Sequence, residues 1–223
     1  MIKLDRNINH DYVTKYLRAL LPKREGLLRE IEEKSAEEDT YVSIAEPETE
    51  QLLRVLIHIS NAKSVLEIGT GSAYSAISMA MEGCSVTTIE RYEKNFNISL
   101  QNIEKSKIKR IKPLFGEASD ILPKLSETFD MIFLDAAKGQ YLNFLPSLLR
   151  LLNEGGILVS DNVLYNGMTA MEGIAVRRKV TIIKRLRKYL EEISKNPYLL
   201  TTVLPIGDGV AISYKRKEEL KNA

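Results

Sequence analysis

The spacing of hydrophobic residues along the chain changes close to residue 63. Upstream of it, apolar side chains recur every three or four positions, which is the spacing of an amphipathic helix. This pattern predicts helices over Tyr12–Leu21, Arg24–Glu38 and Pro47–Ser60. Asp11 stands where a capping residue would begin the first helix, and Pro22 follows its end. Because the apolar stripes need a partner surface, residues 1–62 are expected to form a helical cap or dimerisation segment.

Downstream, short runs rich in β-branched and aromatic residues alternate with helical patterns. The predicted strands are Ser64–Ile68, Ser85–Glu90, Arg110–Phe115, Phe129–Leu134 and Gly156–Ser160. The predicted helices between them are Ser75–Met81, Glu93–Lys105, Ser119–Leu125 and Tyr141–Leu152. Regular alternation of strand and helix predicts a parallel sheet with helices on both faces.

The C-terminal part departs from this alternation. A long predicted helix over Glu172–Lys195 is followed by two apolar runs, Tyr198–Leu204 and Val210–Tyr214. The Pro205–Gly209 turn between the runs predicts an antiparallel hairpin at the edge of the sheet. The whole order predicts an α/β fold of Rossmann-like type, in which residues 63–223 form one domain around a seven-stranded, mostly parallel sheet.

Length and composition set limits on the class of protein. The chain has 223 residues, 44% of them hydrophobic, which is enough for one substantial core. Its single cysteine, Cys84, rules out an internal disulfide framework and fits a reducing compartment. No stretch approaches the roughly 18 consecutive apolar residues of a membrane span, and the N-terminus lacks an apolar signal core. The protein is therefore expected in the cytoplasm, with no membrane partner.

A glycine loop follows the first predicted strand. Gly69 and Gly71 allow a close approach of the backbone to a ligand, although a glycine here can also serve only to tighten the turn. Tyr74 replaces the third glycine of the dinucleotide fingerprint, which disfavours pyrophosphate binding. Glu90, about 20 residues beyond the loop, is positioned to accept the two hydroxyls of a ribose. This combination favours S-adenosylmethionine over NAD.

Glu67 is an unusual residue for the inside of a buried strand. Two interpretations are open. The strand end is solvated there, or the carboxylate orients the amino-acid part of the cationic cofactor. The second interpretation is favoured because the glycine loop follows directly.

Two further predicted strands end in polar residues. Phe129–Leu134 stops at Asp135, and the next strand stops at Asp161 and Asn162. Neighbouring parallel strands end at the same edge of a sheet, so these three side chains are expected to converge. Three oxygen donors without a nearby cysteine or histidine suit a hard cation such as Mg²⁺ or another divalent ion. An ordinary turn at Asp161–Asn162 is the alternative.

The mechanism expected from these groups is metal-assisted methylation of a hydroxyl. Binding to a divalent metal lowers the pKa of a phenol-like or enol-like hydroxyl and fixes its oxygen. Lys138, three residues past Asp135, is the nearest candidate to take the proton, unless it is only an exposed lysine at the start of a helix. The methyl group of the sulfonium cofactor would then transfer in line.

These residues resemble a known family. The run from Val65 to Lys215 is similar to the cation-dependent O-methyltransferases, which include catechol and caffeoyl-CoA O-methyltransferases. The similarity covers about two thirds of the chain and is carried by Leu66–Thr70, Tyr74–Ser75, Ile89–Glu90, Phe129–Lys138, Gly155–Gly156, Asp161–Leu164, Gly167 and Leu204–Gly209. Ala73 departs from the family, which usually has a glycine there.

The resemblance implies a class I methyltransferase fold with S-adenosylmethionine and a divalent metal as cofactors. It implies that the cofactor is surrounded by Ile44, Glu67, Gly69, Ser75, Glu90, Glu117, Ala118 and Asp135. It also implies Asp135, Asp161 and Asn162 as metal ligands, and Lys138 with Asp135 as the catalytic residues. Relatives in the family are often dimeric, so a homodimer is expected.

Within this family, the sequence resembles most the bacterial tRNA 5-hydroxyuridine methyltransferases, which form 5-methoxyuridine at the wobble position. The resemblance is carried by Asp135–Tyr141, Asn143–Phe144, Asp161–Gly167, Asp11–Val13 and Leu17–Pro22. The expected acceptor is therefore tRNA. A small catechol-like molecule or a phenolic CoA ester is the alternative.

The distribution of charge bears on the acceptor, although the net charge is only +2. Basic residues gather on one helical segment and near the chain end: Arg177, Arg178, Lys179, Lys184, Arg185, Arg187, Lys188, Lys215, Arg216 and Lys217. Such a cluster forms a phosphate-binding face, unless it is a solvated helix balanced by acids such as Glu191 and Glu192.

Two other functional classes are open from the residues alone. A nucleoside-binding module without catalysis would keep the cofactor loop but would have no need for the cluster of Asp135, Lys138, Asp161 and Asn162. A nicotinamide oxidoreductase is disfavoured by Tyr74.

Overall fold

The computed structural model describes residues 8–37, 42, 44–172 and 179–217. Its helices are α1 (Asp11–Leu20), α2 (Gly26–Glu37), α3 (Pro47–Ser60), α4 (Tyr74–Met81), α5 (Glu93–Ser106), α6 (Ala118–Ile121), α7 (Tyr141–Leu151) and α8 (Val180–Lys195), with short 3₁₀ turns at η1 (Leu122–Lys124) and η2 (Lys138–Gln140). Its strands are β1 (Ser64–Ile68), β2 (Ser85–Glu90), β3 (Ile111–Phe115), β4 (Phe129–Leu134), β5 (Leu152–Ser160), β6 (Leu199–Leu204) and β7 (Val210–Lys215).

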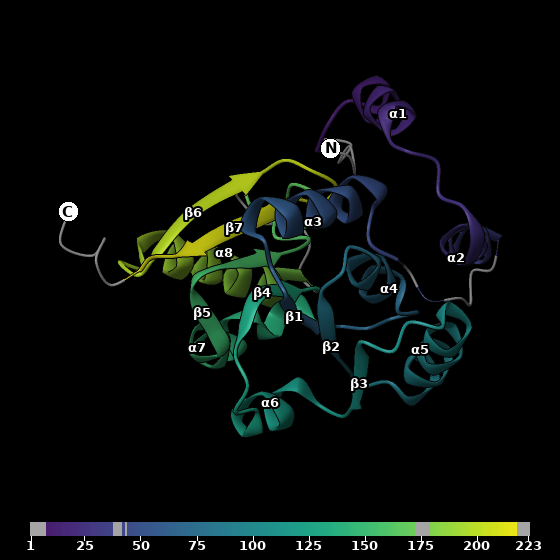
Figure 1. Ribbon diagram of the computed structural model, residues 1–223. Coiled ribbons are helices and arrows are strands. Elements are labelled where there is room, and N and C mark those ends of the chain that lie inside the picture. The colour runs from purple at the N-terminus through teal and green to yellow at the C-terminus, as the bar shows by residue number, and fades with distance from the viewer. Residues whose placement is uncertain (1–7, 38–41, 43, 173–178, 218–223) are drawn as a thin grey trace.

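The strands form one seven-stranded sheet in the order β3-β2-β1-β4-β5-β7-β6 (Figure 1). Strands β1 to β5 run parallel to one another, whereas β7 is antiparallel to both β5 and β6. The predicted Rossmann-like sheet with its C-terminal hairpin is therefore confirmed. The chain order reverses direction between β1 and β4, so the carboxyl ends of these two strands border the crevice where such sheets bind ligands.

Strand β5 starts earlier than predicted, at Leu152 instead of Gly156. The pairing of β4 with β5 is irregular between Phe129 and Met131, and Gly155 adopts a φ of +80° there. A Cβ on Gly156 would come within 2.8 Å of the carbonyl oxygen of Asp130. The two glycines thus allow a bulge that a strand prediction from alternation alone cannot anticipate.

Side chains alternate between the two faces of the sheet, and each face has its own core. Val65 and Phe133 belong to the core under α2, α3 and α4. Leu66 and Leu134 belong to the core under α6, α7 and α8. Apolar side chains are required on both faces because both faces are covered, which explains why most residues of β1 and β4 are hydrophobic.

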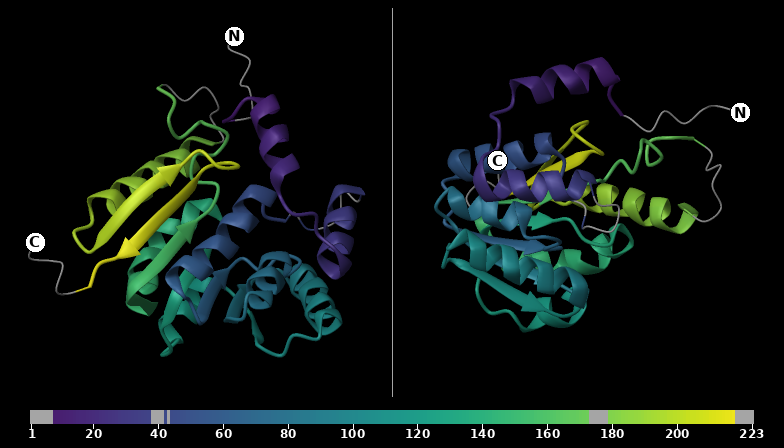
Figure 2. Two further views of the ribbon diagram at one scale, coloured as in Figure 1. Left: turned by 45° about the horizontal axis from the view of Figure 1, so that its top comes forward. Right: turned by 90° about the vertical axis from the view of Figure 1, so that its right-hand side faces the viewer.

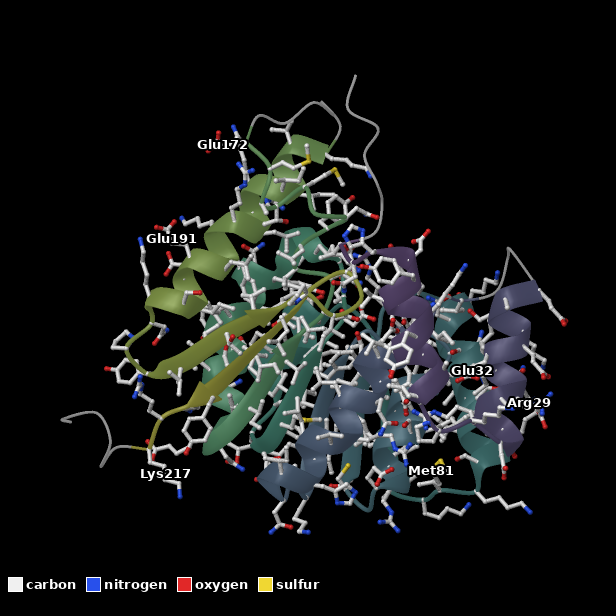
Figure 3. The ribbon with its side chains drawn as sticks, turned by 90° about the horizontal axis from the view of Figure 1, so that it is seen from above. Arg29, Glu32, Met81, Glu172, Glu191 and Lys217 are labelled. Atoms are coloured by element: carbon white, nitrogen blue, oxygen red, sulfur yellow. The ribbon has the colours of Figure 1, made fainter. Side chains whose placement is uncertain are left out.

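The N-terminal helices differ in how they are attached. Helices α2 and α3 contribute buried side chains to the core, whereas α1 has none and stands away from the sheet (Figure 2). The guanidinium of Arg24 forms an ion pair with the fully buried carboxylate of Glu50 in α3, which also accepts a hydrogen bond from Ser78 of α4. The Tyr74 hydroxyl at the start of α4 donates to Glu32 of α2. Figure 3 shows Glu32 and Arg29 on α2, at the opposite side of the molecule from the hairpin.

Two local expectations need correction. Asp11 does not cap α1, because His10 occupies the capping position and Asp11 is the first helical residue, where its charge complements the helix dipole. Helix α8 begins at Val180 and not at the predicted Glu172, which lies in a bend, and residues 173–178 between them lie outside the described residues. In the part of the chain that the structure describes, no helix is both long and apolar enough to cross a lipid bilayer.

Candidate active site

A cavity of about 350 Å³ opens at the carboxyl ends of β1, β2 and β4. Most residues predicted to surround a cofactor line it together: Ile44, Gly69, Ser75, Glu90, Glu117, Ala118 and Asp135. Lys138, predicted to be catalytic, lines it as well. Other parts of its wall were not foreseen from the sequence, among them Val42, Tyr92, Asn95, Gln140 and Phe144. Hydrophobic side chains around a few charged ones are typical of a pocket for a small organic cofactor.

Gly69 is required by the protein backbone itself. It has a φ of +102°, and a Cβ at this position would lie 1.9 Å from the carbonyl oxygen of Asp135. The Asp135 amide in turn donates to the carbonyl of Ile68 at 2.9 Å. Gly69 was expected to allow a ligand to approach the backbone, but it is required first because the end of β4 passes so close to it. This contact joins the cofactor loop to Asp135, the proposed metal ligand.

Backbone amides fix the Glu90 carboxylate at the end of β2. Its Oε2 accepts from the Gly71 amide at 2.9 Å, and its Oε1 accepts from the amides of Arg91 and Tyr92, each at 2.9 Å. A carboxylate held in this way is oriented before any ligand arrives, and Oε2, which accepts one hydrogen bond, retains lone-pair capacity for a hydroxyl donor. This arrangement suits the ribose of a nucleoside cofactor.

Glu67 lies beneath the cavity and does not line it. Its side chain is fully buried, which excludes the solvated strand end. Ser75 donates to Oε1 and Thr88 donates to Oε2, each at 2.5 Å, and Thr88 also contacts Thr70 at 2.6 Å. Burial raises the pKa of Glu67 to about 8, although both hydroxyls oppose this shift. Glu67 thus connects β1, β2 and the start of α4 under the cofactor loop.

Ser72 was missed by the sequence analysis. It lines the cavity, and its buried hydroxyl oxygen has no hydrogen-bond partner in the structure. The Ser72 carbonyl accepts from the Asn102 side chain at 2.9 Å, which holds the loop in position. Buried hydroxyls are normally satisfied, so Ser72 is a further candidate for contact with a ligand. Its position three residues after Gly69 was the only available signal.

Asp135 and Lys138 meet at the end of β4. The Lys138 Nζ lies 3.6 Å from Asp135 Oδ1, and both side chains are partly exposed to the cavity. Burial raises the pKa of Asp135, against the opposing effect of Lys138. The interpretation of Lys138 as an ordinary surface lysine is therefore disfavoured, because its amine faces the cofactor cavity and a carboxylate.

Asp161 ends β5 directly beside the end of β4. Its amide donates to the carbonyl of Leu134 at 3.0 Å, and the hydroxyl of buried Tyr141 contacts the carbonyls of both strand ends, Leu134 at 3.2 Å and Asp161 at 3.1 Å. The Asp161 side chain is only 1% exposed. Burial, and after it the negative charge of Asp135, raise the pKa of Asp161 to about 7. Two carboxylates thus share a poorly solvated space.

The donor set fits a hard divalent cation. Asn162 follows Asp161 with a left-handed φ of 54°, which asparagine tolerates better than most residues, and its amide donates to Asp161 Oδ1 at 2.7 Å. Among the described residues no cluster of three His, Cys, Asp or Glu side chains could hold a metal. The set is instead two carboxylates and one amide, which suits a cation that keeps further positions for water and substrate. A cation would also relieve the repulsion between Asp135 and Asp161.

The buried Glu67 gives the protein a pH dependence that can be measured. Its folded-state pKa of about 8 lies above the ordinary pKa of a glutamate, 4.5, so between these limits the folded state holds a proton that the unfolded state releases. Stability conferred by this group is complete below about pH 4.5 and is lost as the pH rises towards 8. Urea unfolding of Glu67→Gln should therefore show a smaller loss of stability from pH 5 to 8 than wild type, by up to about 1.4 kcal/mol per pH unit. Parallel curves for the two proteins would contradict this assignment.

Comparison with known proteins agrees with this geometry. A family model described as O-methyltransferase matches residues 22–216. Caffeoyl-CoA O-methyltransferase 2 of Populus trichocarpa is 27% identical over 213 residues, covering 89% of this chain and 85% of the relative. Caffeoyl-CoA O-methyltransferase of Petroselinum crispum is 28% identical over 208 residues, covering 87% and 86%.

Solved structures lead to the same conclusion. The putative caffeoyl-CoA O-methyltransferase from Staphylococcus aureus is 33% identical with a TM-score of 0.85, covering 92% of this chain and 100% of that one. The O-methyltransferase from Bacillus cereus in complex with SAH is 27% identical with a TM-score of 0.81, covering 92% and 97%. These similarities favour an enzyme over a nucleoside-binding module or a nicotinamide oxidoreductase. The chain belongs to the O-methyltransferase family and is an S-adenosylmethionine-dependent O-methyltransferase.

Proposed function

We propose that this O-methyltransferase uses a divalent metal, held by Asp135, Asp161 and Asn162, to methylate 5-hydroxyuridine in tRNA. The observation that carries the metal role is the pair of carboxylates at adjacent strand ends, with Asp161 buried and Asp135 partly exposed to the cofactor cavity beside the Lys138 amine. Two poorly solvated carboxylates that face one lysine are costly, so their retention side by side favours a site built for a cation.

The cofactor roles follow from the lining of the cavity. Glu90, already oriented by three backbone amides, would accept the ribose hydroxyls. Ser75 and Gly69 would border the methionine part, with Glu67 holding Ser75 from below. Ile44 and Ala118 supply apolar wall, and Glu117 lies at the rim, where its carboxylate is 3.7 Å from Arg91.

The chain's own residues organise the transfer. A bound divalent cation would supply Lewis acidity that favours ionisation of the acceptor hydroxyl. Asp161 is held by the Asn162 amide and by the packing of β5 against β4, so its orientation is fixed in advance. Lys138, when its amine is neutral, is in position to accept the hydroxyl proton, and Asp135 keeps the amine near the reacting groups. The cavity then orients the cofactor methyl group toward the acceptor oxygen.

Removal of the metal or its ligands tests this scheme. Excess EDTA should abolish turnover and added Mg²⁺ should restore it, while Asp161→Ala should lose turnover with the fold retained in circular dichroism. Lys138→Ala should lower kcat by about a hundredfold or more, with the affinity for S-adenosylmethionine nearly unchanged. Asp120→Ala, at an exposed carboxylate of α6, is the control and should keep full activity. Full activity in EDTA would exclude the metal role.

The choice of tRNA rests on the sequence resemblance and on charge near the site. Arg185 of α8 donates to the carbonyl of Gly139, next to Lys138, and Lys179 lies 5.1 Å over the ring of Tyr165 in the loop after β5. Lys184 and Lys188 are exposed on the same helix. These cations form a basic flank beside the site, as phosphate binding requires.

Other basic residues of the cluster have structural roles or lie outside the described residues. Arg187 donates to the carbonyls of Thr169 and Met171, and Lys215 donates to those of Leu149 and Leu152. Arg177 and Arg178 lie outside the described residues. The phosphate-binding face proposed here is therefore smaller than the one predicted from the sequence.

A phenolic CoA ester is the second candidate acceptor. Its support is the name of the relatives, caffeoyl-CoA O-methyltransferase, which match most of this chain. The basic flank could also receive the phosphates of CoA.

A transfer assay separates the two acceptors. Methyl transfer from labelled S-adenosylmethionine should reach tRNA that carries 5-hydroxyuridine, and unmodified tRNA should remain unlabelled. Replacing Lys184 and Lys188 together by Glu should raise KM for tRNA about tenfold or more at low salt, because each lost phosphate contact weakens binding. Labelling of caffeoyl-CoA with no labelling of tRNA would overturn the choice.

We also propose that the chain forms a homodimer through α1. Tyr12, Tyr16 and Leu20 are four residues apart on one face of this helix and are 72%, 65% and 63% exposed. Helix α1 stands away from the rest of the fold, held by Arg18 to the start of α3 (Figure 2). A second copy of α1 would cover this apolar face.

The dimer has a direct test. Sedimentation should give twice the 25.3 kDa of one chain. Tyr16→Glu combined with Leu20→Glu should give the monomer mass, because charged side chains cannot be buried unpaired at an interface. Lys15→Glu, on the polar face of the same helix, should leave the mass of the dimer unchanged. A monomer mass for wild type would contradict the proposal.

A further inference from the structure

A second cavity, of about 270 Å³, adjoins the candidate metal ligands on the side of α1. Its wall includes Asn162 and comes from α1 and the residues before it, the start of α3, the loop after β5 and the turn between β6 and β7. Apart from Ile8 and Gly207, its lining side chains are polar or charged, among them Asn9, Thr14, Arg18, Glu48, Asn166 and Asp208. The hydrocarbon of a phenolic substrate would gain little from such a wall.

Glu48 has one oxygen that is held by Arg18 and one that has no hydrogen-bond partner. Its Oε1 accepts from Arg18 Nε at 2.9 Å, and the other end of the same guanidinium donates to Glu46. Its Oε2 is buried and has no hydrogen-bond partner in the structure. The Glu48 side chain is only 12% exposed. A buried carboxylate oxygen without a donor is costly, so this atom marks where a donor of a bound molecule would stand.

The charge of the cavity narrows the class of that molecule. Glu46, Glu48 and Asp208 contribute three carboxylates to its wall, and Arg18 contributes the single cationic side chain among its lining residues. Asp208 is already engaged, because its Oδ1 accepts from the Asn166 amide. The wall therefore repels phosphates and carboxylates and favours a neutral group that carries N–H or O–H donors.

We infer that this cavity receives the imide edge of a hydroxylated pyrimidine, with Glu48 Oε2 accepting the N3–H of the base. The inference rests on the acceptor proposed above. In 5-hydroxyuracil the 5-hydroxyl, the 4-carbonyl and the N3–H follow one another along the ring edge. A base whose two oxygens face Asp161 and Asn162 therefore presents its N3–H to the adjoining cavity. A catechol has only a C–H at this position, so Glu48 is a specificity-determining residue for a nucleobase.

The test compares two RNA hairpins that differ by one methyl group, one with 5-hydroxyuridine and one with its N3-methyl derivative. Wild type should prefer the parent RNA at least tenfold in kcat/KM, because a site with a buried polar group rejects an analogue that lacks the matching donor. The same preference should appear in equilibrium binding, measured by fluorescence anisotropy with SAH present. This arm uses only the wild-type protein.

The Glu48→Gln variant then assigns the preference to one atom. Arg18 keeps the amide oxygen at the position of Oε1, so the amide NH₂ takes the position of Oε2 and meets the N3–H donor to donor. The preference for the parent RNA should fall to about onefold in both measurements. Glu33→Gln, the same change at an exposed carboxylate of α2, is the control and should keep the tenfold preference.

The outcomes separate this inference from the proposed function. Equal treatment of the two RNAs by wild type, or a tenfold preference retained by Glu48→Gln, would overturn the role of Glu48 while the tRNA acceptor stands. If wild type methylates neither RNA, the acceptor assignment fails, and the inference fails with it.

Discussion

The close contact between two strand ends governs the geometry of this enzyme. The loop after β1 passes the end of β4 so closely that a Cβ on Gly69 would lie 1.9 Å from the carbonyl oxygen of Asp135. A hydrogen bond from the Asp135 amide to Ile68 fixes the same junction. The cofactor loop and the first proposed metal ligand are therefore parts of one rigid unit. Methyl donor and acceptor can be held at a constant separation because the backbone, rather than flexible side chains, sets their relative position.

Charge burial is the second constraint on the site. Glu67, Asp135 and Asp161 all have raised pKa values, and burial is the first cause in each case. The free-energy cost of burying these carboxylates is offset differently at each position. Hydroxyls of Ser75 and Thr88 satisfy Glu67, whereas Asp135 and Asp161 repel each other and face a single lysine. Raised carboxyl pKa values in a cleft are typical of functional sites, and here they distinguish a structural carboxylate from a pair suited to a cation.

Much of the fold could be predicted from local pattern. The ends of β1, β2 and β4 agree with the sequence prediction to the residue, because apolar strands stop abruptly at Gly69, Glu90 and Asp135 where the chain reaches the ligand edge. The convergence of Asp135 with Asp161 followed from the parallel order alone. The start of β5 was not predictable in this way, since the bulge at Gly155 and Gly156 depends on the close approach of Gly156 to Asp130 in the neighbouring strand.

The parts of the site that were missed depend on tertiary packing. Glu48 and Arg18 are 30 residues apart on two amphipathic helices, and nothing in either helix indicates that they meet beside Asn162. Glu67 was recognised as unusual for a strand, but its partner Thr88 lies on β2, and only the strand register brings the two together. Ser72 had no signal beyond its place in the loop. The local spacing of apolar residues determines where helices and strands form. Contacts between those helices and strands determine which polar groups lack a partner in the protein and can bind a ligand.

The hydrogen bond from Tyr74 to Glu32 connects a residue of the cofactor pocket to a helix of the N-terminal segment. A second link joins the same regions, because Ser78 of α4 donates to Glu50 of α3, which also pairs with Arg24. Sequence divergence in α2 is therefore coupled to divergence at the first turn of α4. A chimaera that combined the N-terminal segment of one relative with the catalytic core of another would have to transfer both sides of these pairs together, so the segment is inherited with its core and is not an interchangeable module.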